Sequence, residues 1–204
     1  MFTGIVLSKG TLEEKTEIGG DVRLRIDTGR LSLASAREGD SICVSGACLT
    51  MLELTEFSFA ADVSQETLGL TTLGRLEIGG QVNLELALGL DDRMGGHLVT
   101  GHVDGMAQLV SRHQDARAER FEFEVPRPLA RYIARKGSVC VDGVSLTVNE
   151  VDDTQFSICI IPHTLVVTTL GNLTAGEVVN LEVDLIARYL DRLNQYGPSE
   201  SIGD

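Results

Sequence analysis

The sequence has few aromatic residues and no long apolar segment. Tryptophan is absent and aromatic side chains make up only 4% of the 204 residues, so a platform of rings that stack on nucleic-acid bases is not expected. The formal net charge of −13 also disfavours binding to a phosphate backbone, which lysine and arginine must neutralise. No apolar run approaches the ~20 residues of a membrane span, and the N-terminal residues do not resemble a signal peptide. We therefore expect a cytoplasmic protein with no nucleic-acid and no membrane partner.

Motifs for metal and nucleotide binding are also missing. The four cysteines, Cys43, Cys48, Cys140 and Cys159, include no CxxC pair, and in a reducing compartment they are expected to be free thiols. There is no phosphate-binding loop and no GxSxG nucleophile motif. No cysteine–histidine cluster has the spacing of a zinc site. The sequence therefore predicts neither a metal site nor a bound cofactor.

The chain contains an internal duplication with a shift of 97 residues. Residues 67–86 and 164–183 are identical at twelve of twenty aligned positions, and residues 40–51 match 137–148. A polar, glycine-rich stretch separates the copies, as expected of a linker. We therefore predict three parts: an N-terminal repeat with its linker over 1–96, a C-terminal repeat over 97–184, and a tail over 185–204.

Hydrophobic residues alternate with a period of two within each copy, which is typical of β-strands. About six strands in one copy suit a closed Greek-key barrel, which leaves no exposed edge. The predicted fold class is all-β, with two tandem homologous six-stranded Greek-key barrels and a C-terminal α-helix. In the first copy, strands are expected at 2–6, 22–26, 41–45, 48–54, 57–62 and 82–87. Short helices are expected near 30–38, 65–73, 127–135 and 162–170, and the stretch GGHLVTGHVDG at 95–105 is expected to hold the first strand of the second barrel.

The tail has the pattern of an amphipathic helix. Asp184 is suited to cap its start. Apolar residues then recur at helical spacing on one side, at Leu185, Ile186, Tyr189, Leu190 and Leu193. This apolar side could pack on the barrel of its own chain or contact another subunit, and the sequence leaves both alternatives open. Residues 197–204 are expected to be disordered.

Several equivalent positions differ in chemistry between the copies. The pairs are Cys48 and Ser145, His102 and Ile5, and Glu66 and His163. Taken alone, Cys48 is more often a small core residue than a nucleophile, and His102 is more often a hydrogen-bonded strand residue than a catalyst. Glu66 and His163 could be simple helix caps, and His97 is interpreted as structural. Because a polar serine stands opposite Cys48, the core interpretation of this cysteine is weakened.

Several separate motifs are shared with one known family. They are MFTGIV at 1–6, GACLT at 46–50, GGHLVTGHVDG at 95–105, DGVSLTV at 142–148, and TTLG at 71–74 and 168–171. Together they closely resemble riboflavin synthase of the alpha type, from Met1 to about Leu193. The resemblance implies that two molecules of 6,7-dimethyl-8-ribityllumazine exchange a four-carbon unit, giving riboflavin and 5-amino-6-(D-ribitylamino)uracil without metal or cofactor. It also implies a homotrimer held by the C-terminal helix, and lumazine synthase is a further partner that it suggests.

The resemblance also implies the site residues. Those matching positions of the family's chemistry are Phe2, Ser41, Cys48 and His102. Substrate-binding positions assigned to the first copy are Gly4, Ile5, Val6, Leu49, Thr50, Asp62, Val63, Ser64, Gln65, Glu66 and Thr67. Those assigned to the second copy are Gly101, Val103, Lys136, Ser145, Leu146, Thr147, Ile161, Pro162, His163, Thr164, Leu165 and Val166, with Asp184 near the site. The working site is implied to lie between the first barrel of one subunit and the second barrel of its neighbour.

A non-catalytic carrier of lumazine or flavin with the same fold is the alternative function. Such relatives, called lumazine proteins, lack the cysteine and the second histidine of these motifs. This chain has both Cys48 and His102, which favours the enzyme. Because the reaction has a donor and an acceptor, two identical pockets could not assign these roles, and the residues that differ between the copies are the candidates for doing so.

Overall fold

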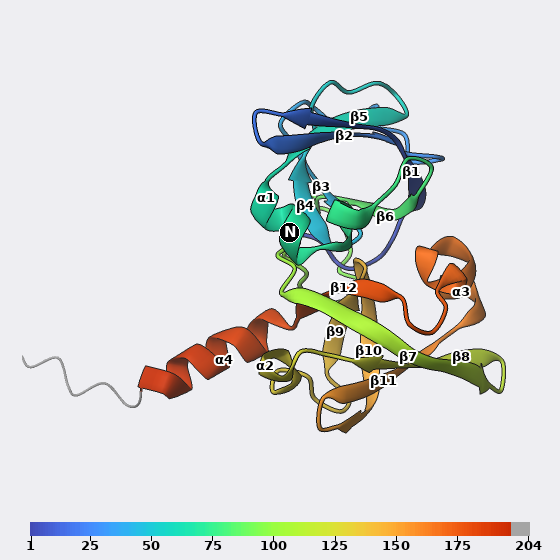
Figure 1. The fold of residues 1–204 in the computed structure, drawn as a ribbon, viewed down its shortest axis with the longest axis vertical. Helices are drawn as coiled ribbons and strands as arrows, with labels where there is room; N and C mark the ends of the chain where they lie inside the picture. The colour runs from blue at the N-terminus through green and yellow to red at the C-terminus, as the bar shows by residue number, and fades with distance from the viewer. Residues whose placement is uncertain (197–204) are drawn as a thin grey trace, which may run out of the picture.

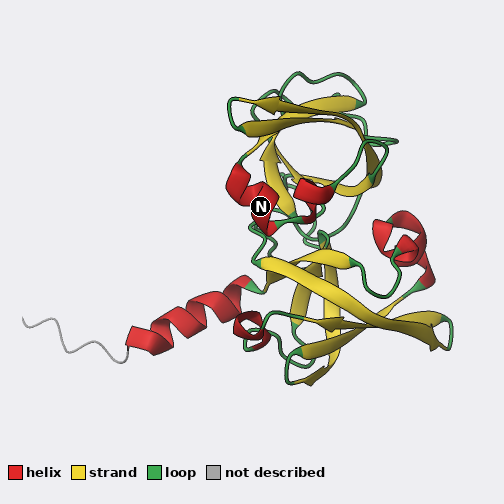
Figure 2. Cartoon of the chain, viewed as in Figure 1, coloured by secondary structure: helices red, strands yellow, loops and turns green. Residues whose placement is uncertain are grey.

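Each half of the chain folds into six antiparallel strands, and the two halves lie one above the other (Figures 1 and 2). The computed structural model describes residues 1–196, so the predicted tail at 197–204 lies outside the described residues. The first half contains β1 (Ser8–Ile18), β2 (Asp21–Asp27), β3 (Ser41–Val44), β4 (Ala47–Thr50), β5 (Ser58–Val63) and β6 (Gln81–Leu86). The second contains β7 (Gly105–Asp115), β8 (Ala118–Glu124), β9 (Ser138–Val141), β10 (Val144–Asp152), β11 (Gln155–Ile160) and β12 (Val178–Val183). The helices are α1 (Gln65–Leu70), η1 (Thr72–Arg75), α2 (Arg127–Ala130), α3 (Pro162–Val167), η2 (Thr169–Asn172) and α4 (Leu185–Tyr196).

The two halves have the same strand order. The first sheet runs β4-β3-β6-β1-β2-β5, and the second runs through the equivalent strands and closes into a barrel where β10 pairs with β9 and β11. In both, the last strand lies between the first and the third, as in a Greek key. The edge strands of the first sheet are β4 and β5. An isolated bridge between Leu52, just after β4, and Ala60 on β5 connects these two edges. The prediction of an all-β fold with two homologous barrels and a C-terminal helix is confirmed.

Alternating side chains give each barrel its own core. Leu24 and Ile26 on β2 are fully buried, and so are Phe121 and Phe123 on β8, while the residues between them face outward. Burying a side chain of this size contributes about 1.5–3 kcal/mol. The helices expected near 65–73 and 162–170 are present, each as a short α-helix followed by a 3-10 turn.

Three sequence predictions about local structure are wrong, and a fourth is only partly right. Residues 2–6 make only one bridge, between Phe2 and Val99, and the first strand begins at Ser8. Likewise GGHLVTGHVDG forms no first strand, because β7 begins at Gly105. Residues 30–38 form turns instead of a helix, and the helix near 127–135 covers only Arg127–Ala130. The alternating apolar residues at 2–6 and 98–103 resemble those of a strand. Their backbone amides, however, donate hydrogen bonds to the side chains of Glu85 and Glu182.

Two equivalent sets of hydrogen bonds, one from each repeat, join the two barrels. Asn83 on β6 donates from Nδ2 to the carbonyl oxygen of Asp142 (2.9 Å), and its Oδ1 accepts from the amide of Thr169 (2.8 Å). The equivalent Asn180 donates to the carbonyl oxygen of Ser45 (2.7 Å) and accepts from the amide of Thr72 (2.7 Å). The repeats are therefore related by an approximate two-fold arrangement, and both buried asparagine amides are satisfied.

The interface between the barrels makes stability depend on pH through Asp142. Burial raises the pKa of this carboxyl group from 3.8 to about 7, opposed by one hydrogen bond from the amide of Asn180. Because the folded pKa is above the unfolded one, the stabilising contribution is present below about pH 4 and is lost as the pH rises through about 7. Asp142→Asn keeps an acceptor oxygen but cannot ionise. We expect it to have a higher Tm than the unmodified protein at pH 8, and the difference to shrink at pH 5 and to vanish near pH 4.

Thermal unfolding at both pH values measures this difference. Asp153→Asn is the matched control, because Asp153 also has a positive φ (48°, against 46° for Asp142) but its side chain is exposed. An Asp142→Asn gain in Tm that is the same at pH 5 and pH 8 would contradict the prediction.

The helix α4 contacts the second barrel through its polar side. Asp184 caps it, with Oδ1 accepting from the amide of Ile186 (2.9 Å). The side chain of Asp191 is buried and bonds Arg131 and the hydroxyl of Tyr132, the latter at 2.8 Å. The apolar side remains exposed, with Ile186, Tyr189, Leu190 and Leu193 between 55% and 68% accessible. The apolar side of α4 therefore does not pack on the barrel of its own chain in this structure. Within residues 1–196, no helix is both long and apolar enough to span a membrane.

Candidate functional site

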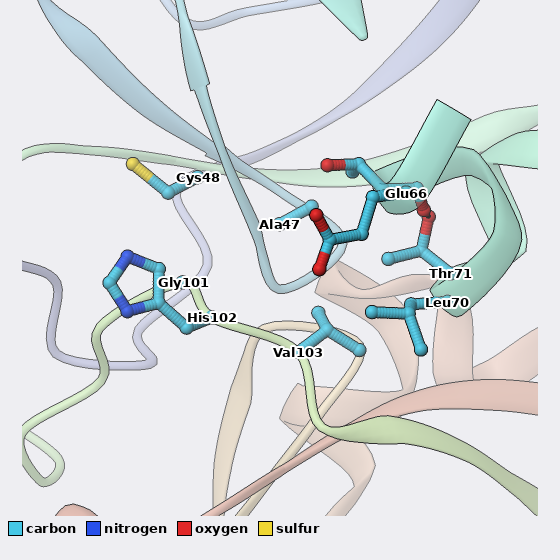
Figure 3. A pocket seen from close by; sticks show the side chains of 9 residues that line it. Ala47, Cys48, Glu66, Leu70, Thr71, Gly101, His102 and Val103 are labelled. Carbon is cyan, nitrogen blue, oxygen red and sulfur yellow. Dashed lines mark hydrogen bonds between the residues drawn. The ribbon is translucent and has the colours of Figure 1, made fainter. Parts of the chain in front are cut away.

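The pocket that holds most of the chemically active side chains lies at the first barrel (Figure 3). Its volume is about 220 Å³. Cys48 comes from β4, Glu66 from the start of α1, and His102 from the loop before β7. Figure 3 shows Cys48 and His102 at one end of the pocket and Glu66 at the other. The remaining lining residues are Ala47, Thr67, Leu70, Thr71, Gly101 and Val103.

The two repeats exchange the segments that close their pockets. The amide of Cys48 donates to the carbonyl oxygen of Gly101 (2.8 Å), and the amide of Ser145 donates to the carbonyl oxygen of Gly4 (2.8 Å). Val103 packs on the core of the first barrel and Val6 on that of the second. By their place in the chain, residues 4–6 belong to the first copy and 101–103 to the second, but each segment lies against the opposite barrel. The backbones cross at the Phe2–Val99 bridge, so each segment reaches the other barrel.

Buried glutamates fix both exchanged segments. Glu182 on β12 accepts from the amide and hydroxyl of Thr100 (both 2.7 Å) and from the amide of Gly101 (2.9 Å). Glu85 on β6 binds Thr3 and Gly4 in the same way, at 2.6–2.9 Å. Burial raises the pKa of both carboxyl groups, and these hydrogen bonds oppose the rise. The sequence signal for these two residues was a glutamate at matched positions between apolar residues of β6 and β12, and it was missed.

The cysteines separate into core and pocket residues. Burial raises the pKa of the Cys43 thiol and of the Cys140 thiol, so both remain protonated. They pack with Phe2 and Val99 in a small apolar cluster. Cys48 is only partly buried and lines the pocket. It is therefore the thiol that a ligand in the first pocket can reach.

Glu66 and His163 are not helix caps. The cap of α1 is Ser64, whose Oγ accepts from the amide of Thr67 (3.2 Å). The cap position of α3 is Ile161, which makes no side-chain bond. Glu66 therefore has a carboxylate free to face the pocket (Figure 3), and His163 occupies the equivalent place in the second repeat.

A histidine and a serine meet at the second barrel. His97 Nδ1 lies 2.6 Å from Ser145 Oγ, and both side chains are partly buried. The sequence interpreted His97 as structural and did not connect it with Ser145. One feature of the sequence does mark His97. Shifted back by the repeat length of 97 residues, it falls before Met1, so it has no counterpart in the first repeat.

Several predicted site residues lie outside the first pocket. Ser41 begins β3 opposite Thr50 and lines a separate cavity of about 290 Å³. The carboxylate of Asp62 is bound by Arg23 at 2.6 and 2.8 Å, and this pairing lowers the pKa of Asp62. Phe2 is fully buried, and Lys136 is exposed with a positive φ of 66°.

Comparisons with known proteins agree with the repeat. The family model described as "Lumazine binding domain" matches residues 3–87 and 100–184. Riboflavin synthase of Photobacterium phosphoreum is 44% identical over 95% of this chain and 88% of that protein. Riboflavin synthase of Brucella abortus (strain 2308) is 44% identical over 96% of this chain and 99% of that protein. The solved structure of LumP complexed with 6,7-dimethyl-8-(1'-D-ribityl) lumazine covers 90% of this chain and 99% of its own, with a TM-score of 0.80 and 26% identity.

Proposed function

Since the chain belongs to the riboflavin synthase family and is an enzyme of riboflavin biosynthesis, we propose that it converts two molecules of 6,7-dimethyl-8-ribityllumazine. One molecule donates a four-carbon unit to the other, giving riboflavin and 5-amino-6-(D-ribitylamino)uracil. The observation that carries this proposal is the first pocket, in which Cys48 of β4 and His102 of the exchanged loop face one cavity.

Two similar pockets suit a reaction between two identical molecules. Holding both rings in a fixed orientation removes much of the entropic cost of their encounter. The pockets differ where the reaction must distinguish donor from acceptor, because the first pocket has Cys48 and His102 where the second has Ser145 and Ile5. His102 would transfer protons to and from the methyl groups or an attacking water, and Cys48 would stabilise the acceptor ring or add to it transiently.

The remaining side chains would bind the substrate. Glu66 is placed to accept hydrogen bonds from ribityl hydroxyls, because no helix-capping bond occupies it. Asp62 already accepts two hydrogen bonds from Arg23 and has fewer lone pairs left for ribityl hydroxyls. Thr50 and Thr147 occupy equivalent outward-facing positions on β4 and β10 and would bind the edge of the pyrimidinedione ring. Ser41, from its separate cavity, would assist proton transfer.

We further propose that the reacting molecules meet between subunits. The helix α1 lines the first pocket, and the equivalent α3 lies on the opposite side of the molecule (Figure 1). Two ligands in the pockets of one chain would therefore not face each other. A homotrimer formed through the exposed side of α4 would bring the first barrel of one subunit to the second barrel of its neighbour.

Glycine at position 101 is expected to be necessary for the geometry of the first pocket. Its φ is +83°, and a Cβ there would lie 2.5 Å from the Cβ of Cys48. Gly101→Ala should therefore displace the loop that carries His102, and a displacement of about 1 Å can lower a rate about 100-fold. Steady-state measurement of riboflavin formation tests this. Gly79→Ala is the matched control, because Gly79 has a similar φ of +87° but open space around it. Equal losses in the two variants would contradict the prediction.

A lumazine or flavin carrier is the second candidate function, favoured by the likeness to LumP structures complexed with the lumazine and with riboflavin. Incubation with 6,7-dimethyl-8-ribityllumazine alone separates the two. Formation of riboflavin absorbance, with no added cofactor, is expected of the enzyme. Tight binding of unchanged, fluorescent lumazine would identify the carrier and refute the proposed reaction.

A further inference from the structure

Two cysteines of the first barrel lie directly opposite each other on neighbouring strands. Cys43 on β3 pairs with Cys48 on β4, across a hairpin whose turn consists of Ser45 and Gly46. The amide of Cys48 donates to the carbonyl oxygen of Gly101, outside the hairpin. The two cysteines are therefore a non-hydrogen-bonded pair, in which the Cα atoms are about 4.5 Å apart. A disulfide needs Cα atoms roughly 4.4–6.8 Å apart, so the backbone already meets this requirement.

Both thiols lie on the outer face of the first barrel. The residues on either side of each cysteine pack in the core of that barrel, and side chains alternate along a strand, so the two cysteines face away from this core. Cys48 packs against the small apolar cluster that contains Cys43. Side chains in strands commonly adopt two different χ1 angles. Rotation about χ1 is therefore enough to bring the two sulfur atoms together.

The two thiols differ in how a solute reaches them. Cys48 lines the first pocket and is only partly buried (Figure 3). Cys43 is buried between the barrels, with its Sγ 3.5 Å from where a Cβ at Gly143 of the second barrel would lie. Burial raises the pKa of the Cys43 thiol, and the nearby Cys48 raises it further. An oxidant that enters the pocket therefore meets Cys48 first, while Cys43 waits beside it as a protected second thiol.

The second repeat has only one thiol at the equivalent place. Cys140 on β9 occupies the repeat position of Cys43, and it is also buried between the barrels. Its partner across the hairpin is Ser145, at the repeat position of Cys48. A serine cannot form a disulfide, so only the first hairpin has the two thiols in register. The chain thus contains a matched control for any chemistry of the first pair.

We propose that Cys43 and Cys48 are a redox pair, which a small hydroperoxide that enters the first pocket converts to a disulfide. The sulfur of Cys48 takes one oxygen from the peroxide, the O–O bond breaks and water leaves, so Cys48 becomes a sulfenic acid. The sulfur of Cys43 then bonds to that of Cys48, and the sulfenic hydroxyl leaves as a second water with the Cys43 proton. The two thiols together lose two electrons, and the peroxide gains them.

The hairpin makes the second step favourable and the bond reversible. A thiol with a raised pKa reacts slowly in free solution, but here the hairpin holds Cys43 against Cys48, which replaces a bimolecular encounter. The disulfide closes a loop of only a few residues and so constrains the unfolded chain little. A dithiol reductant should therefore open it again. While the bond is closed, the sulfur of Cys48 is turned away from the pocket, and its proposed contact with the acceptor ring is lost.

The test treats the full-length protein with excess hydrogen peroxide, blocks the remaining thiols and maps the cross-linked peptides by mass spectrometry. We expect a peptide pair joined through Cys43 and Cys48, and its loss after dithiothreitol. Riboflavin formation should fall about 100-fold, as expected when a group in a pocket moves by about 1 Å, and dithiothreitol should restore it. Only this activity measurement rests on the proposed function.

Two variants at repeat-related positions complete the test. Cys43→Ala should be active before oxidation, but Cys48 then has no partner and proceeds to sulfinic acid, which dithiothreitol does not reverse. Cys140→Ala removes an equally buried thiol and should behave like the unmodified protein.

Three results would overturn the proposed pair. They are oxidation of Cys48 without a link to Cys43, a link between Cys43 and Cys140 instead, and reversal by dithiothreitol that persists in Cys43→Ala. A protein that forms the link but binds 6,7-dimethyl-8-ribityllumazine without converting it retains the redox pair and refutes only the proposed function. The two failures are therefore distinguished by separate measurements.

Discussion

His102→Gln is expected to lower kcat for riboflavin formation by roughly 100- to 10,000-fold, the contribution typical of general acid–base catalysis. His102 supplies the imidazole of the first pocket, and its side chain is exposed toward the cavity beside Cys48. Glutamine has a similar reach and can still form hydrogen bonds, but it does not exchange protons near neutral pH. The loss should therefore appear in kcat, with a smaller effect on KM.

Turnover of the His102→Gln variant should be measured from about pH 6 to pH 9. Loss at every pH is expected, because no protonation state of the amide replaces the imidazole. His113→Gln, which removes an exposed imidazole on β7, should leave turnover unchanged. Near-native turnover of His102→Gln across this range would rule out a proton-transfer role for His102.

Leu193→Glu on α4 is expected to give monomers that retain little activity. The apolar side of this helix is free in the single chain, where Leu193 is 68% exposed. Burying a leucine contributes about 1.5–3 kcal/mol, and each 1.4 kcal/mol changes a dissociation constant about tenfold. Losing this burial should therefore weaken assembly by about 10- to 100-fold, and a charge buried in a subunit contact weakens it further. Mass by light scattering and kcat, measured on the same samples, test this.

A substitution is a sharper test than deletion of residues 185–204. Deletion also removes Asp191, which is buried against Arg131 and Tyr132 of the second barrel, so it could unfold that barrel. Asn194→Glu adds the same charge at a neighbouring exposed position outside the apolar stripe, and it should remain assembled and active. Fully active monomers of Leu193→Glu would refute the proposal that the working site forms between subunits.

The duplication made most of the fold predictable. The period of two and the repeat shift are local properties of the sequence, and they placed Val22–Ile26 in a buried strand and gave both halves one topology. The amphipathic pattern likewise predicted α4 and its apolar side. The segment at 2–6 was misassigned because its apolar spacing resembles a strand, whereas its amides bond the side chain of Glu85, more than eighty residues away.

The sequence singled out candidate residues of the site but not how they come together. Cys48 and His102 differ from their repeat positions, and both line the first pocket. Cys48 and His102 come together because the backbone segments at Phe2 and Val99 cross. A local sequence pattern does not predict such a crossing. The contact between His97 and Ser145 joins residues 48 positions apart, and it has no equivalent in the first repeat that could have drawn attention to it.

The exchange of pocket-closing segments also bears on how such a chain could have arisen. A protein with a single repeat would have one such segment, and it could close its pocket only by trading that segment with a second copy. Every pocket of that ancestral pair would have been identical, because a change in the segment would appear in both. In a chain with two repeats, the segment is present twice and each copy can change by itself. His102 could then be selected at one pocket while Ile5 was kept at the other, so two identical sites could become unequal ones without any change of fold.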